Sequence, residues 1–141
     1  QLAVGIMEWK KGNTFGTVAF TSYGAFWITL VALVVMPRIG WADAPAAASF
    51  ASYLAVWGCF SLLLFIGTLR LNRALQFVFG TLVILFFLLA AAKATGSAAL
   101  LKVAGYEGIV CGASAMYAAI AQVYNEMHGK TVLPLGPVRK G

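Results

Sequence analysis

Charged side chains are scarce in this sequence. Only 10% of the 141 residues are charged, whereas 62% are hydrophobic. A soluble domain of this length would not have enough polar side chains to cover its surface. The composition therefore excludes an ordinary soluble fold and indicates a protein whose solvent is a lipid bilayer.

Residue types that serve catalysis and metal binding are also few. Cys59 and Cys111 lie inside apolar tracts without a CxxC spacing or a nearby histidine, so we expect small buried packing residues and no disulfide or metal site. His128, the only histidine, falls in a polar stretch where we expect it to be solvated. Because no Ser/His/Asp set, carboxylate pair or phosphate-binding glycine loop is present, we predict no enzyme and no cofactor.

Four long apolar tracts dominate the chain. A membrane-spanning helix needs about twenty consecutive apolar residues, since its backbone polar groups have to be satisfied internally. The sequence therefore predicts an all-α, polytopic transmembrane helix bundle that forms one domain. The predicted spans are at about residues 15–36, 46–69, 74–92 and 103–124, within the single domain 1–141.

Three segments are too short or too polar to span. The N-terminal QLAVGIMEW resembles the end of a helix and lacks the basic start and cleavage site of a signal peptide, so we expect the chain to be a fragment. KATGSAALLK, residues 93–102, is predicted to be a loop or an interfacial turn. Residues 125–141 form a predicted cytoplasmic tail, whose TVLPLGPVRKG stretch we expect to be irregular and exposed to solvent.

The basic residues predict the orientation of the bundle. They come singly or in pairs, so nucleic acid is not an expected partner despite a net charge of +6. Lys and Arg accumulate in short cytoplasmic loops, which places the C-terminus inside. The predicted cytoplasmic side carries Lys10, Lys11, Arg70, Arg73, Lys130, Arg139 and Lys140, and the other side carries Arg38, Lys93 and Lys102.

Hydroxyl groups are frequent in the first predicted span. Thr14, Thr17, Thr21 and Gly24 recur at three- and four-residue steps and share one helical face. Such a face suits helix packing, and it also suits a path for a polar solute. Tyr23 lies on a different face, and a phenol in mid-membrane needs a partner or a wet cavity.

The fourth predicted span contains two further features. Gly108 and Gly112 form a GxxxG pattern, which predicts a seam for helix packing or oligomerisation. Glu107 is the only acidic residue within the predicted spans. It is either a functional ionisable group at membrane depth or an interfacial residue within reach of water and Lys102.

Six runs along the chain are distinctive in their order and spacing: EWKKGNTFGTVAFTSYGAFW, MPRIG, DAP, LQFVFG, CGASAMY and NEMHGKTVLPLG. Together they resemble the acetate uptake transporter family, which includes bacterial succinate–acetate permeases. The resemblance implies a six-helix protein of the bacterial inner membrane with both termini inside. It also implies a homo-hexamer in which each protomer takes up acetate and succinate, with protons, by carrier-like or channel-like passage.

The resemblance also implies where the path is narrow. The family builds a hydrophobic constriction from a Phe, a Tyr and a Leu; the Tyr matches Tyr23 in FTSYGAFW and the Leu matches Leu82 after LQFVFGT. The constriction's Phe and the family's Asn-Pro-Ala-Pro-Leu-Gly-Leu run have no match. The sequence thus carries four full spans of the family's six and the end of another.

Four more residues are expected along this path. Ser22 and Thr81 are each next to a constriction residue, and Ala115 in CGASAMY is placed to tune the width. Gln1 falls on the family's second helix as a candidate pore amide.

The alternative is a structural membrane subunit or assembly partner that does not transport. It would be held by the Gly108/Gly112 seam, with Tyr23 and Leu82 packed against neighbours and no continuous cavity.

Overall fold

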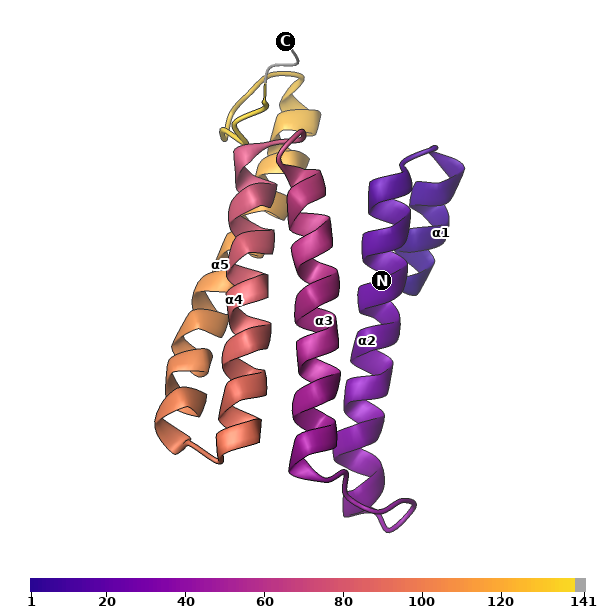
Figure 1. The fold of residues 1–141 in the computed structure, drawn as a ribbon. Coiled ribbons are helices and arrows are strands. Elements are labelled where there is room, and N and C mark those ends of the chain that lie inside the picture. Colours follow the sequence, from indigo (N-terminus) through magenta and orange to yellow (C-terminus); the bar gives the residue numbers. More distant parts are fainter. Residues whose placement is uncertain (139–141) are drawn as a thin grey trace. The chain divides into compact units, whose positions relative to one another are not determined.

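The structure, a computed structural model, describes residues 1–138 and is all-helical (Figure 1). Within these residues no strand occurs beyond one isolated bridge between Asn72 and Pro137. The all-α prediction is confirmed. The helices are α1 (Leu2–Lys10), α2 (Thr14–Arg38), α3 (Ala47–Thr68), α4 (Arg73–Thr95) and α5 (Ala98–His128).

Four of these helices are long and apolar enough to cross a membrane: α2, α3, α4 and α5. The shortest, α3, has 22 residues and is about 33 Å long at 1.5 Å per residue, which exceeds the hydrocarbon thickness of about 30 Å. Large apolar side chains such as Ile28, Leu63 and Ile109 are exposed on them. Helices that are apolar on their exposed faces suit lipid rather than water.

The chain divides into two compact units, one from Gln1 to Ala46 and one from Ala47 onward. Organisation as a single domain over 1–141 stays a prediction.

In the first unit, α1 packs against α2 at glycine positions. A Cβ added at Gly24 would lie 2.8 Å from the backbone nitrogen of Leu2, and one added at Gly5 would lie 3.0 Å from that of Thr21. Only a residue without a side chain permits such approach. The face of α2 that carries Thr21 and Gly24 is therefore a helix contact, as the packing interpretation of the hydroxyl-rich face expects.

The turn between these two helices is fixed by the EWKKGN run. Asn13 is the N-cap of α2: its side-chain oxygen accepts a hydrogen bond from the Gly16 N–H (3.1 Å), and its amide donates to Glu8. The Lys11 ammonium lies 3.7 Å from the same carboxylate. Gly12, with φ of +72°, provides the left-handed residue that reverses the chain.

In the second unit, α4 packs against both α3 and α5. Small side chains allow the contact with α3: a Cβ at Gly58 would lie 3.1 Å from the Phe87 ring. Ser61 and Thr68 are fully buried on α3, and their hydroxyls donate to the Trp57 and Phe65 carbonyls of the same helix. Such back-bonding satisfies a hydroxyl where no water is available.

Residues 93–102, predicted to be a loop or an interfacial turn, do not form a loop but contain a short turn between two helices. α4 continues to Thr95, and α5 begins at Ala98. Two residues suffice for the reversal, because Gly96 adopts φ of +66° and Ser97 caps α5 by accepting a hydrogen bond from the Leu100 N–H (3.3 Å). The AALL residues that follow are good helix formers, although they are too weakly apolar to indicate a span.

The two cysteines differ in burial. Cys111 is buried, as predicted, with its Sγ 3.8 Å from the Val78 carbonyl on α4. Cys59 is exposed, so its predicted burial is wrong. Its neighbour Gly58 occupies the face of α3 that meets α4, and one residue of helical rotation turns the Cys59 side chain away.

Candidate functional site

The first unit contains Gln1, Ser22 and Tyr23 of the predicted path, and Gln1 lines a pocket there. A pocket of about 280 Å³ is lined by Gln1, Leu2, Ala3, Gly24, Trp27 and Ile28. Gln1 therefore lies at the level of Gly24, the residue that follows Tyr23 on α2. Ser22 and Tyr23 are half-buried and Gln1 is exposed.

In the second unit, Thr81 and Leu82 lie half-buried on α4, and Ala115 is exposed on α5. The Thr81 hydroxyl donates to the Phe77 and Val78 carbonyls at 2.9 and 3.0 Å. Its proton is thus engaged within the helix, and a bound carboxylate would have to compete for it. Tyr23 and Leu82 belong to different units, so the constriction that they would form together stays a prediction.

The glycines of the GxxxG pattern lie in different surroundings. A Cβ at Gly108 would lie 3.5 Å from the Leu85 side chain of α4, which is ordinary contact, whereas one at Gly112 would meet no atom within 4 Å. Gly108 therefore faces α4 within the unit, and Gly112 leaves space for another helix. Their role as a seam stays a prediction.

Glu107 directly precedes Gly108 on α5. Both carboxylate oxygens are buried, and no residue of 1–138 provides them with a hydrogen bond. Because α5 begins at Ala98, Glu107 lies about 14 Å along the helix from its first residue. The predicted span began at about residue 103 and placed Glu107 only one turn from its start. The observed helix begins earlier, so Glu107 lies deeper in it.

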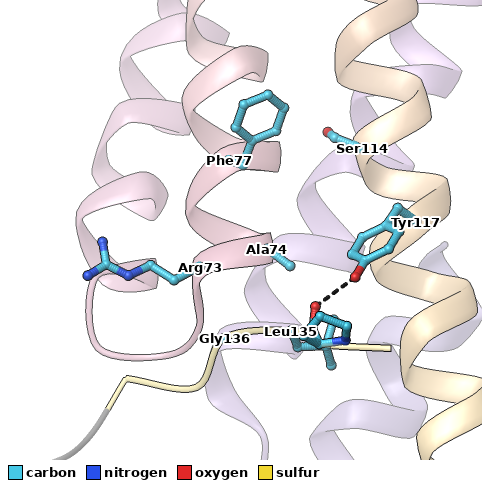
Figure 2. Close-up of a pocket in the computed structure, with 8 residues that line it drawn as sticks. Arg73, Ala74, Phe77, Ser114, Tyr117, Leu135 and Gly136 are labelled. Atoms are coloured by element: carbon cyan, nitrogen blue, oxygen red, sulfur yellow. Dashed lines mark hydrogen bonds between the residues drawn. The ribbon is translucent and has the colours of Figure 1, made fainter. Parts of the chain in front are cut away.

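A second pocket, of about 500 Å³, lies where α4 begins (Figure 2). Nothing in the sequence analysis indicated it. The Phe77, Ser114 and Tyr117 side chains surround it, whereas the Arg73 guanidinium points away from them. The lining is Arg73, Ala74, Phe77, Ser114, Tyr117, Pro134, Leu135 and Gly136.

The pocket is closed on one side by residues 131–138, which we call the strap. Asn125 holds it with its whole amide: Nδ2 donates to the Leu133 carbonyl (2.8 Å), while Oδ1 accepts from the N–H groups of Val132 (2.7 Å) and Leu133 (2.9 Å). The Tyr117 hydroxyl donates to the Pro134 carbonyl (2.8 Å). The strap is irregular, as predicted for the tail, but its Leu133 and Leu135 are half-buried rather than free in solvent.

The strap also completes the first turn of α4. The first N–H groups of a helix have no partner within it. Here the Arg73 N–H donates to the Gly136 carbonyl (2.8 Å) and the Ala74 N–H to the Leu135 carbonyl (3.0 Å). The Asn72 side-chain oxygen accepts a hydrogen bond from the Leu75 N–H. The N–H groups of Arg73, Ala74 and Leu75 therefore all have partners. Arg139 and Lys140, counted with the predicted cytoplasmic charges, lie outside the described residues.

Residues 1–138 contain no group of three or more His, Cys, Asp or Glu side chains that is arranged to hold a metal ion. Comparison with known proteins gives a clear assignment. The sequence profile of the GPR1/FUN34/yaaH family matches residues 1–139. The chain belongs to this family.

Similar GPR1/FUN34/yaaH proteins are named as transport proteins. The succinate-acetate/proton symporter SatP of Escherichia coli (strain K12) is 54% identical over 136 residues, which are 96% of this chain and 72% of SatP. Acetate permease A of Emericella nidulans is 30% identical over 151 residues, which are 96% of this chain and 50% of that permease. These relatives are transporters and not enzymes.

A solved structure of this family agrees with the fold. The structure of the bacterial acetate channel SatP matches with a TM-score of 0.93 at 53% identity, over 96% of this chain and 75% of that one. Together with the four apolar helices, it identifies the chain as a multi-pass membrane protein.

The strap yields a direct prediction. Asn125→Ala removes three hydrogen bonds, each worth about 1 kcal/mol, so we expect the Val132 and Leu133 amides to exchange hydrogen roughly ten-fold faster or more. Hydrogen exchange with mass spectrometry on the purified protein measures this. Gln122→Ala, at an exposed position on the same helix, is the matched control and should leave both amides protected. Equal exchange in the two variants would contradict the role of Asn125.

Proposed function

We propose that this protein is a permease of the bacterial inner membrane that takes up acetate and succinate together with protons. The similarity to SatP carries the proposal, because it extends over 96% of the chain in both sequence and structure. The chain has the apolar helices that a path through the membrane requires.

The path would narrow at Tyr23 and Leu82. An apolar constriction without fixed charge raises the barrier to free ions, because they have to lose water there without replacement. A carboxylic acid crosses such a place when it is protonated or briefly held by hydrogen-bond donors. The resemblance to permeases and the half-burial of both side chains support this assignment.

Polar groups on either side of the constriction would hold the carboxylate. Ser22 and Thr81 each adjoin a constriction residue, and Gln1 lines the pocket beside Gly24. Ala115 would limit the width from α5. The hydrogen bonds that the Thr81 hydroxyl makes within its helix make it the weaker donor of these groups.

Succinate uptake tests the proposal most cleanly, because neutral acetic acid crosses lipid without a protein. Proteoliposomes that contain the purified protein should accumulate labelled succinate under an inward proton gradient, and empty liposomes should not. Leu82→Ala widens the constriction, so lactate uptake relative to acetate should rise by roughly ten-fold, the scale of one-methylene discrimination in an apolar site.

Leu88→Ala is the matched control, since Leu88 is a half-buried leucine on another face of α4. Its lactate-to-acetate ratio should equal that of the wild type. If Leu82→Ala leaves the ratio unchanged, the constriction assignment fails. If the folded wild-type protein moves no succinate, the permease proposal fails and a structural subunit becomes the better account.

The proposal places the C-terminal side of α5 in the cytoplasm, on the side with more basic residues. In a background with Cys59 and Cys111 replaced by alanine, Lys130→Cys should react with an impermeant thiol reagent only after cells are opened. Ala94→Cys, beside Lys93 at the other end of the unit, should react in intact cells. The reverse pattern would invert the topology.

We also propose a homo-hexamer with one path in each protomer, as the family resemblance implies. Gly112, which has open space around it, is a candidate contact for a second copy. Native mass spectrometry of the detergent-purified protein should give six copies in its main assembly, and a monomer as the main species would contradict this state.

A further inference from the structure

Glu107 differs from the other acidic residues of this chain in its position. The sequence has four Asp and Glu residues. Glu8 lies in the last turns of α1, Asp43 in the loop after α2, and Glu126 in the last turn of α5. Glu107 alone lies within a helix and away from its ends.

Its depth follows from the contacts between α4 and α5. At one end the pair is joined by the two-residue turn Gly96–Ser97, and at the other end Ser114 and Tyr117 line a pocket with Ala74 and Phe77. Gly108 meets Leu85 between these ends. Glu107 therefore lies near the middle of the antiparallel pair, the part that the bilayer core surrounds.

At this position an ionised carboxylate is costly. Both oxygens are buried without a hydrogen bond from residues 1–138, and an unpaired charge in an apolar medium carries a large desolvation cost. Carboxyl groups at such depth in membrane proteins mark ion paths and proton relays.

No cation offsets this charge from α4, the helix on which α5 packs in this unit. Its ionisable side chains are Arg73 and Lys93, one near each end. The Arg73 guanidinium points away from α5 in Figure 2. The Lys93 ammonium lies 5.2 Å from the centroid of the Phe50 ring.

On α5 itself the nearest ionisable side chains are Lys102 and Tyr106, both exposed, and Cys111. Cys111, one turn further along the same helix, has its Sγ 3.8 Å from the Val78 carbonyl of α4. The hydroxyl of Thr81 donates to the same carbonyl, and Thr81 adjoins Leu82, the constriction residue. Glu107 therefore lies one helical turn from the contact between α5 and the part of α4 that carries Leu82.

We propose that Glu107 is the proton-binding group of carboxylate uptake. The inference rests on the proposed permease function. The carboxylate takes a proton from the side of higher proton concentration, the neutral acid persists while the substrate anion passes, and the proton leaves on the other side. The ionised form is then restored, and one proton has moved with each substrate.

Two measurements on proteoliposomes test this role. One is succinate accumulation driven by an inward proton gradient; the other is succinate counterflow at equal pH on both sides, which needs passage but no net proton movement. In the wild type, one pH unit of gradient should give about ten-fold accumulation if one proton accompanies each succinate. Glu107→Gln, a permanently neutral side chain of nearly the same shape, should keep counterflow and lose this accumulation.

Glu107→Asp preserves the titratable group and should keep gradient-driven accumulation. Accumulation by Glu107→Gln equal to the wild type would overturn the proposal, because the proton would then travel on the substrate. Loss of counterflow in Glu107→Gln, with size-exclusion chromatography showing a folded protein, would also overturn it. If Glu107→Gln does not fold, Glu107→Ala, which also removes the carboxyl group, replaces it with the same expected result and the same contradicting results. Failure of wild-type counterflow would instead refute the permease function.

Discussion

The structure depends on one constraint, which is that polar groups inside lipid have to find partners within the protein. Helices satisfy the backbone, and the buried hydroxyls of Ser61 and Thr68 donate to carbonyls of their own helix. Where a helix begins, the chain provides a cap, as Asn13 and Ser97 do. Against this background the unpartnered carboxylate of Glu107 is the exception among the described residues.

The constraint also explains the hydroxyl-rich stretch of α2. Thr17 and Thr29 donate to carbonyls three or four residues before them, and Thr21 meets α1 at Gly5. Hydroxyl groups used in this way let helices approach closely, and few of them remain available to donate hydrogen bonds to a substrate. A path for carboxylates through such helices would therefore rely on a small number of polar groups.

Much of the fold follows from the sequence, because long apolar tracts have one solution in lipid. The helices α2, α3 and α4 are of this kind. A loop or a turn was expected within residues 93–102, but its short length was not predicted. Hydropathy indicates the solvent that a segment prefers and not its conformation, and AALL is helical without being strongly apolar. The strap was missed because it depends on hydrogen bonds from Asn125 and Tyr117 to carbonyls of a segment without periodicity.

The candidate site was predictable in part. Tyr23 and Leu82 came from family resemblance, since no local pattern distinguishes a constriction from packing. Glu107 was evident as the one acidic residue within a predicted span.

The hydrogen bonds between the strap and α4 also order events during synthesis. The first N–H groups of α4 depend on carbonyls at Leu135 and Gly136, more than sixty residues later in the chain. A ribosome has to complete α5 and move beyond it before those partners exist. Until then the beginning of α4 has to remain near water or another protein, so this end of the unit closes last during biogenesis.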